Sequence, residues 1–332
     1  MLHVWLPSGE ELASVPAENL TDVKSLKQHL HSLCGLPRFR QRLLCERDPV
    51  DDHASLHVPM DVQLILLPFA EATLEQRNEM TSAASWADPV WMEELLQRPQ
   101  DPSLPDFGQR IPLHMACHYG HMLLLEAQAD KNSTDISGTT ALHVAAGGSH
   151  ADTVRVLLEA RVDHGKVDGE ERTALHTACM SGHVHVVRLL VDVGSDTEAL
   201  DGKGKSPLHH ACIRGGHVAA MRFLLEARAV MDAVDGEGQT PLHLASGNGL
   251  VENVRLLLEA GADKNKADKA GSTPLHWACK QAPYAVARLL VGAGASKNLA
   301  DEDGQMPLDY ALTRKQRVPK LELLLSEASV CD

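Results

Sequence analysis

The chain has 332 residues, of which 44% are hydrophobic and 3% aromatic. That length suits about two domains, and the apolar content is sufficient for a buried core. The formal net charge of −14 disfavours non-specific binding to nucleic acid. Neither a secretory signal nor an apolar run long enough to cross a membrane is evident, so we expect an intracellular protein, cytoplasmic or nuclear, without membrane insertion.

The first 69 residues predict an α+β fold. Apolar and polar residues alternate over 2–6, a Ser-Gly turn follows at 8–9, and a second alternating run completes a hairpin. A helix is expected over 22–34, because apolar residues recur there at helical spacing after a Thr-Asp start. Strands are predicted at 41–45 and 61–67.

In this order of elements, the segment resembles ubiquitin. The likeness is carried by Val-Lys at the start of the helix, by the sequence GLPRFRQRLL at 35–44 and by the last strand. It implies a β-grasp domain over residues 1–69, with its recognition face at Leu44, Gln63 and Ile65. No diglycine tail follows Leu67, so the domain is expected to be a built-in module and not a modifier. The alternative is that these side chains only cover the sheet.

The rest of the chain repeats one motif, written DGEGQTPLHLA at residues 235–245. Its leucine returns at intervals of 29, 33, 33, 34, 33 and 33 residues. A fixed period near 33 is the signature of a solenoid. The leucines are Leu113, Leu142, Leu175, Leu208, Leu242, Leu275 and Leu308.

Each repeat predicts a turn followed by two antiparallel helices. An Asp seven positions before the motif leucine and, in most repeats, a Gly four before it favour a tight turn. Thr or Ser two before the leucine offers an N-cap, and Pro one before it suits the first helical position. A second apolar run at helical spacing follows. Residues 73–105 fit a degenerate capping repeat, the short interval after Leu113 indicates a shortened one, and a helix over 320–326 is expected to close the stack.

The repeat resembles the ankyrin repeat in its T-P-L-H-x-A core, its Gly-His step and the ending at 257–265. The resemblance implies an all-α ankyrin-repeat solenoid over 70–332, with about eight helix pairs including the two caps. In that family the turns project as fingers and the shorter helices line a concave groove that holds other proteins.

The histidines and cysteines favour repeat structure over chemistry. Ten of the 19 histidines occupy the motif and Gly-His positions, and Cys117, Cys179, Cys212 and Cys279 share one repeat position. We therefore predict no catalytic, metal or cofactor site, and no small-molecule substrate is evident. A thiol enzyme using Cys279 near His276 is a third reading, after the two functions given below. Modification of Asn132, Asn265 or Asn298 would rest on the resemblance alone.

A basic, partly aromatic row is predicted to contact a protein partner, and its charge favours an acidic one. The alternative is an ordinary solvated face, and Trp277 is also compatible with the core. The candidate residues are Arg110, His118, Tyr119, Arg172, Lys203, Lys205, Arg214, Lys269, Trp277 and Lys280.

We therefore expect a non-enzymatic scaffold that binds a protein partner through its fingers and groove. The second hypothesis is an adaptor in ubiquitin-dependent turnover, in which the N-terminal domain engages the machinery and the repeats select the client.

Overall fold

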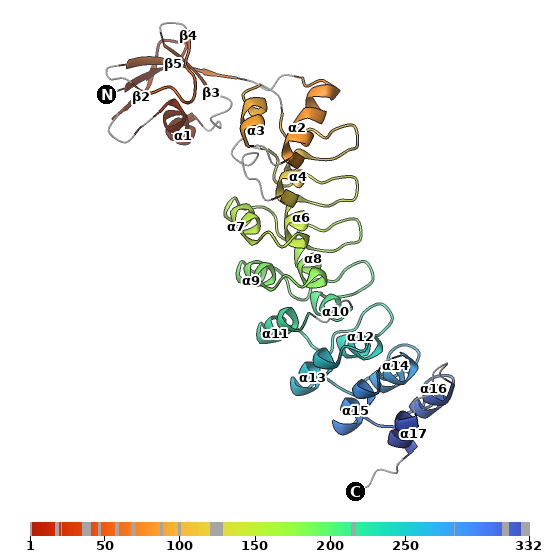
Figure 1. The fold of residues 1–332 in the computed structure, drawn as a ribbon. Helices are drawn as coiled ribbons and strands as arrows, with labels where there is room; N and C mark the ends of the chain where they lie inside the picture. The colour runs from red at the N-terminus through yellow and green to blue at the C-terminus, as the bar shows by residue number, and fades with distance from the viewer. Residues whose placement is uncertain are drawn as a thin grey trace. The chain divides into compact units, whose positions relative to one another are not determined.

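The structure is a computed structural model, and its elements carry the labels of Figure 1. It describes residues 2–16, 20, 22–34, 41–45, 48–56, 60–67, 71–86, 89–98, 101–119, 129–213, 217–281, 283–313 and 319–326. The chain forms two compact units, residues 1–136 and 137–332. The domain boundary predicted between residues 69 and 70 stays a prediction.

The first unit begins with a mixed sheet in the order β2-β1-β5-β3-β4. β1 and β5 pair in parallel at its centre, while the pairs β1–β2, β3–β5 and β3–β4 are antiparallel. This arrangement of five strands and one helix is compatible with the expected β-grasp domain. The short strand β4 was not predicted. The elements are β1 (Leu2–Trp5), β2 (Glu11–Val15), α1 (Val23–Cys34), β3 (Gln41–Cys45), β4 (Asp48–Pro49) and β5 (Met60–Leu66).

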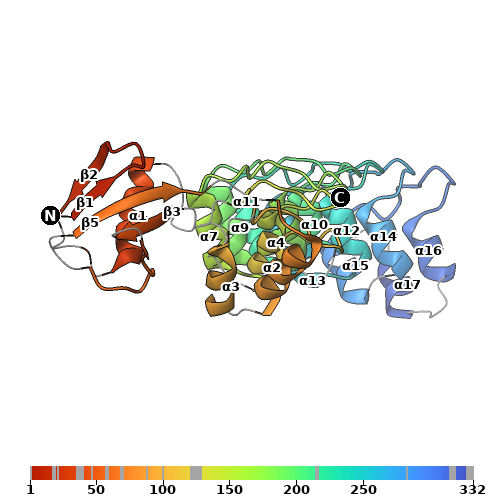
Figure 2. The same ribbon diagram turned by 90° about the horizontal axis from the view of Figure 1, so that it is seen from above.

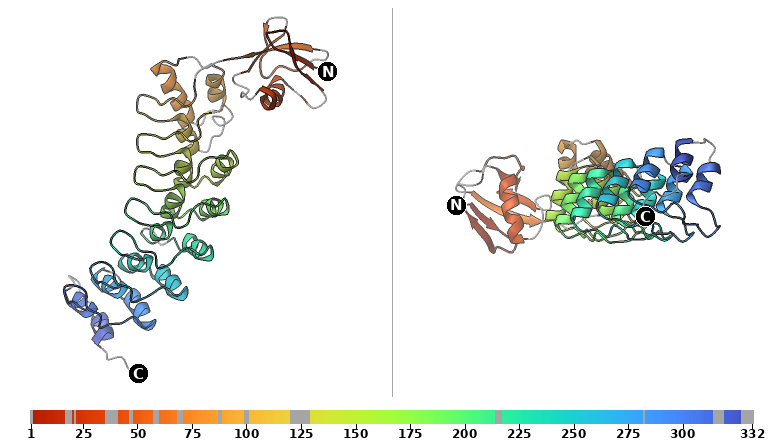
Figure 3. Two further views of the ribbon diagram at one scale, coloured as in Figure 1. Left: turned by 180° about the vertical axis from the view of Figure 1, so that it is seen from behind. Right: turned by 90° about the horizontal axis from the view of Figure 1, so that it is seen from below.

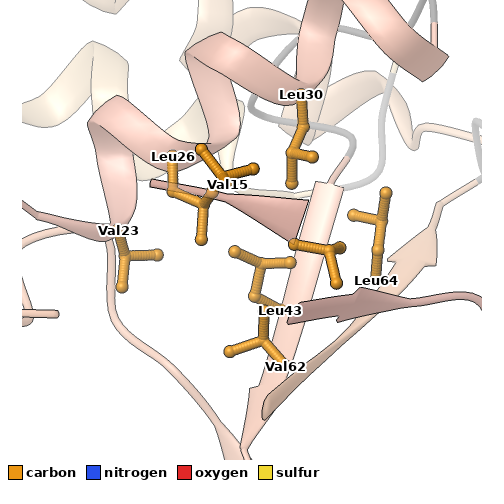
Figure 4. Packing of buried hydrophobic residues seen from close by; sticks show 8 residues of the cluster. Val15, Val23, Leu26, Leu30, Leu43, Val62 and Leu64 are labelled. Atoms are coloured by element: carbon orange, nitrogen blue, oxygen red, sulfur yellow. The ribbon is translucent and has the colours of Figure 1, made fainter. Parts of the chain in front are cut away.

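The core of this domain lies between α1 and one face of the sheet (Figure 4). Val23, Leu26 and Leu30 project from α1 at helical spacing and are buried. Leu43, Val62 and Leu64 meet them from the central strands, where every second residue faces inward. Alternate residues of β3 and β5 therefore face the other side of the sheet.

The described part of the first unit contains three further helices, α2 (Leu74–Trp86), α3 (Pro89–Leu96) and α4 (Pro112–Tyr119). Met80 and Ala83 of α2 and Leu95 and Leu96 of α3 are buried. These are the apolar positions that the repeat period assigns to residues 73–105. The helix pair expected there is confirmed, whereas the shortened helix expected after His121 lies outside the described residues.

The second unit stacks helix pairs in two layers, with connecting loops along one edge (Figures 1 and 2). The views in Figure 3 show the same order from behind and below. The inner helices are α6 (Ala141–Gly147), α8 (Ala174–Ser181), α10 (Pro207–Ala211), α12 (Pro241–Gly247), α14 (Pro274–Gln281) and α16 (Pro307–Thr313). The outer helices are α7 (Ala151–Glu159), α9 (Val184–Asp192), α11 (Val218–Glu226), α13 (Val251–Glu259), α15 (Tyr284–Gly292) and α17 (Pro319–Ser326).

The inner helices begin where the motif predicts: α6, α8, α10, α12 and α14 directly follow its Thr or Ser, and α16 begins at Pro307 after Met306. In α12, Thr240 has extended backbone, and its hydroxyl accepts the backbone N–H of His243, so it caps the helix. Pro241 occupies the first turn, where its missing N–H leaves no bond unmade. Leu242 is fully buried, because each inner helix packs against its neighbours in the stack.

Candidate protein-binding surface

Each connecting loop of the second unit is a tight turn built around the motif aspartate; we call these turns the fingers. In the finger of residues 235–239, Asp235 Oδ1 accepts the backbone N–H groups of Glu237 and Gln239 at 3.0 and 2.9 Å. Asp168, Asp201, Asp268 and Asp301 accept the same pair of bonds in their own fingers. The motif carboxylate, which is half-buried at Asp268 and buried in the other four fingers, therefore holds each turn in its conformation.

The second carboxylate oxygen takes a different donor in each finger. Arg172 donates to Asp168 within one finger, and Lys205 donates to Asp235 of the next. Elsewhere the donor is the residue two after the motif leucine: His210 for Asp201 at 2.8 Å, Trp277 for Asp268 at 2.9 Å and Tyr310 for Asp301 at 2.7 Å. Different side chains thus complete the same turn.

These bonds keep the finger carboxylates ionised. Burial raises the pKa of Asp168, but hydrogen bonds from the Arg172 side chain and backbone outweigh it, and the pKa lies below its ordinary value. The pKa values of Asp201, Asp235 and Asp301 are lowered by the same balance of burial and hydrogen bonding. An ionised acceptor makes shorter and stronger hydrogen bonds, which stiffens the turn.

Backbone hydrogen bonds join neighbouring fingers into a ladder along the edge of the second unit (Figure 2). The residue after each motif aspartate donates its N–H to the carbonyl of the residue two after the aspartate of the preceding finger. Its rungs, 2.7 to 3.0 Å long, are Gly169 to Ser137, Gly202 to Glu170, Gly236 to Lys203, Lys269 to Glu237 and Glu302 to Ala270.

The motif histidines tie the inner helices to this ladder. The His176 ring accepts the N–H of Thr173 at Nδ1 and donates from Nε2 to the Lys205 carbonyl of the next finger, at 3.0 Å in both bonds. His143, His209, His243 and His276 make the same bridge. Burial lowers the pKa of His176 and of His209 to about 4, so both rings are neutral. Each of these fingers is consequently held both by the inner helix of the preceding repeat and by the neighbouring finger.

Three of the predicted basic contacts form ion pairs with motif aspartates. Arg110 pairs with Asp106 in the first unit, as Arg172 does with Asp168 and Lys205 with Asp235 in the second. The Arg172 and Lys205 side chains are mostly buried. The basic residue three positions before the motif leucine thus stabilises the turn by pairing with a motif aspartate.

The other predicted contacts have different surroundings. Lys203 is exposed at a finger tip, Lys269 donates to the Gly236 carbonyl at 2.6 Å, and Lys280 lies 5.7 Å from the Tyr310 ring centre. The half-buried Trp277 donates to Asp268, and His118 is exposed at the end of α4. The Tyr119 side chain and Arg214 lie outside the described residues.

Sequence reasoning missed a row of exposed aliphatic residues on the fingers. Val167, Leu200 and Val234 directly precede the motif aspartate in three consecutive repeats, and they are 48%, 53% and 44% exposed. Alignment of the repeats on their aspartates places the three in one column, so the signal was present in the sequence.

The N-terminal sheet brings its three predicted residues together. Leu44 of β3 lies opposite Gln63 of β5, and Ile65 lies opposite Arg42 two pairs further along. All three side chains are half-buried on the sheet face away from α1. On the other edge of β5, Trp5 of β1 lies opposite Gln63; sequence reasoning missed this aromatic neighbour.

The candidates for chemistry have structural surroundings. Burial raises the pKa of the Cys117 and Cys212 thiols to about 12, and Cys279 is fully buried. Within the described ranges, no three His, Cys, Asp or Glu side chains are placed to hold a metal ion. Asn265 accepts the N–H of Ser296 at 2.8 Å, and modification of Asn132, Asn265 or Asn298 stays a prediction.

Comparison with known proteins identifies the repeats. The family profile "Ankyrin repeats (3 copies)" matches overlapping segments from residue 80 to residue 301: 80–168, 113–201, 149–235, 193–268 and 228–301. Since these matches cover more than half of the chain, it belongs to the ankyrin-repeat family. No curated protein matches it.

Two solved structures illustrate the relationship. The human ASB11 ankyrin repeat domain is 30% identical, with a TM-score of 0.59, and the match covers 66% of this chain and 99% of that one. The ankyrin repeat domain of Bcl-3, described as a unique member of the IkappaB protein family, is 27% identical, with a TM-score of 0.56 and coverages of 69% and 100%. Ankyrin repeats mediate protein–protein binding, and the family is generally non-enzymatic. Among the described residues, no helix is both long and apolar enough to cross a membrane.

Proposed function

We propose that this protein is a non-enzymatic scaffold that holds a protein partner along its fingers and inner helices. The observation that supports this most is the combination of a fixed backbone and exposed side chains in the fingers. Buried Asp and His side chains and the backbone ladder hold the turns, while Lys203 and Glu237 at the tips are exposed. Such a surface orders few groups on binding, which lowers the entropic cost of association.

Site-specific photo-crosslinking with the full chain tests this surface. A photoreactive residue at Glu237, on a finger tip, is expected to capture a protein partner from the native cell extract. The matched control is the exposed Arg222 on outer helix α11, where we expect no adduct. Adducts at Arg222 without adducts at Glu237 would place the partner on the outer helices and contradict the proposal.

The partner's acidity stays a prediction, and the structure changes how to test it. Reversing Arg172 or Lys205 to Glu would remove a bond that completes a finger, so a loss of capture would not be specific. Lys203→Glu leaves those bonds intact. If the partner is acidic, this reversal should slow association at low salt by several-fold without changing the melting transition.

The second candidate function is an adaptor in ubiquitin-dependent protein turnover. It is supported by the strand order of the N-terminal sheet and by the half-buried group of Leu44, Gln63 and Ile65 on one face. Pull-down with the full chain should then recover proteasome or ubiquitin-ligase components. Ile65→Glu should abolish that recovery, and Asp61→Asn, an exposed change in the same strand, should not. An intracellular location rests on the sequence expectation alone.

A further inference from the structure

The aliphatic row on the fingers is a fixed and repeated feature. Val167, Leu200 and Val234 are each covalently joined to a buried motif aspartate that accepts two backbone N–H bonds. The backbone of these three residues is therefore restrained, and their side chains stay exposed. Single exposed aliphatic residues are ordinary, but here three occupy one column of consecutive repeats and form a regular apolar row. The two following fingers carry Ala267 and Ala300 in that column, where the row ends.

The spacing of the row restricts what can lie on it. Helices in contact pack about 8–10 Å apart, so residues of one column recur at about 10 Å along the stack. In an α-helix, residues seven apart lie on nearly the same face and about 10.5 Å apart. In an extended strand three residues span about 10 Å, but the first and fourth side chains point to opposite faces. A helix matches the row, and a strand does not.

A polyproline segment also has a suitable repeat, with about 9.3 Å for every three residues. Such segments dock into grooves lined by aromatic side chains. The fingers that carry the row, residues 166–172, 199–205 and 233–239, contain no aromatic residue. The chemistry of the row therefore favours an aliphatic helix face over proline rings.

Charges next to the row alternate in sign. Glu170, Lys203 and Glu237 stand three residues after Val167, Leu200 and Val234, each at the tip of its finger. Lys203 and Glu237 are exposed, and Glu170 is about two-thirds exposed although it lies 3.4 Å from Arg172. The order negative, positive, negative is complementary to positive, negative, positive. That complementary order reads the same in both directions, so it does not depend on the polarity of the bound helix.

We propose that the fingers over residues 166–239 bind an amphipathic α-helix of a protein partner. Its aliphatic residues, seven apart, contact Val167, Leu200 and Val234. Its flanking charges, in the order positive, negative, positive, face Glu170, Lys203 and Glu237. This assignment rests on the proposed scaffold function and specifies the partner for one part of that surface.

Two synthetic helical peptides of closely matched composition test the register, with the full chain as receptor. Both carry Leu at every seventh position; one has flanking charges in the order Lys-Glu-Lys and the other Glu-Lys-Glu. Because three exposed ion pairs form with the first peptide and three like-charge contacts with the second, we expect the first to bind about tenfold more tightly at low salt. Glu170→Lys, Lys203→Glu and Glu237→Lys together should reverse that preference.

The apolar half of the assignment has its own matched variants. Leu200→Ser should weaken binding of the preferred peptide about tenfold, because the aliphatic contact is lost. Val193→Ser, a change at a similarly exposed residue just after outer helix α9, should leave binding unchanged. Both substituted positions are exposed, so thermal melts of the two variants are expected to coincide with that of the parent chain.

Several outcomes would overturn the assignment. Equal affinity for the two peptides, absence of binding by both, tighter binding of a proline-rich or purely acidic peptide, or insensitivity to Leu200→Ser would each contradict it. Crosslinking at Glu237 distinguishes this failure from failure of the scaffold function. Adducts at Glu237 without helical-peptide binding would support the scaffold function and contradict the helical partner. Absence of adducts at Glu237 would contradict the proposal that the fingers bind a partner.

Discussion

At the scale of single residues, a histidine ring links each of the inner helices α6, α8, α10, α12 and α14 to the next finger. The His176 ring uses both nitrogens, accepting at Nδ1 and donating at Nε2. A protonated ring has no acceptor, so a proton on Nδ1 would remove the bond from the Thr173 N–H. The motif histidines, whose number could suggest a catalytic or metal site, therefore have a structural role in connecting the repeats.

The depressed pKa of these rings predicts a loss of stability in mild acid. His176 and His209 titrate near pH 4 in the folded chain and near 6.5 when unfolded, so above pH 6.5 both states are neutral and stability is complete. As pH falls from 6.5 towards 4, the unfolded chain takes up protons first, and unfolding becomes easier by on the order of a few kcal/mol. Urea midpoints measured from pH 7.5 to 4.5 should fall steadily.

A variant provides the control for that experiment. His209→Asn removes one titrating ring, so its midpoints should decline less steeply with acid than those of the parent, from a lower starting value. Midpoints that stay level between pH 7.5 and 5 would show that the buried rings are not the source of any acid sensitivity.

The motif leucine and the finger tip should differ sharply in their response to truncation. Leu242 is fully buried in α12, and its replacement by Ala removes packing at two repeat interfaces, costing about 2–5 kcal/mol. Glu237→Ala removes an exposed side chain and should stay within about ±0.5 kcal/mol. Denaturant midpoints compare the two directly, and similar losses would contradict the repeat register.

At the scale of elements, the loops of the stack use glycines for two separate reasons. Gly204 has φ +72°, which an L side chain rarely adopts, and a Cβ there would lie 2.8 Å from the N atom of Gly236 in the next finger. Gly261, after α13, has φ +95°, with no atom within 4 Å of the Cβ position. Only the first glycine is required by a neighbouring repeat.

Substitution of these two glycines separates backbone strain from finger contact. Gly261→Ala should cost about 1–2 kcal/mol, the ordinary cost of a left-handed L residue. Gly204→Ala should cost more, by about another 1–3 kcal/mol, because the rung from Gly236 to Lys203 is also disturbed. Unfolding curves of the two variants decide the matter, and equal losses would mean that the ladder contributes no stability.

The inner helix α10 is unusually short and depends on side chains of the following repeat. It ends at Ala211, and the carbonyls of Ala211 and Cys212 accept side-chain N–H bonds from Asn253 and Asn248, at 3.4 and 3.2 Å. Asn253 is buried in α13, where a polar group must be hydrogen-bonded. We regard these amides as substitutes for the missing last turn of α10.

Loss of the Asn253 side-chain amide should destabilise α10 as well as the site of substitution. Asn253→Ala is expected to destabilise the chain by about 1–3 kcal/mol, because the Ala211 carbonyl loses a buried donor. Hydrogen exchange of α10 amides should accelerate more than that of α14 amides, which are further along the stack. Uniform acceleration in both helices would show that α10 does not depend on this contact.

At the scale of the whole molecule, periodicity made most of the fold predictable. The position of one leucine fixed the starts of the inner helices and the fingers, since each repeat must bury the same face against its neighbours. The N-terminal sheet followed from alternation, except for β4, whose two exposed residues leave no apolar pattern. What the sequence could not show was the use of individual charges. Arg172 and Lys203 are both basic and only about one repeat apart, yet one completes a turn and the other is exposed.

The finger ladder also bears on how such a surface can vary over generations. Its rungs join main-chain atoms only, so stacking places little demand on the side chains that stand at the acceptor positions. Five of those positions within this one chain carry Ser137, Glu170, Lys203, Glu237 and Ala270, which are small, acidic, basic, acidic and apolar. Mutational drift at these sites can therefore change the chemistry of the finger surface while the folding free energy stays nearly constant, so surface and stability are free to evolve separately.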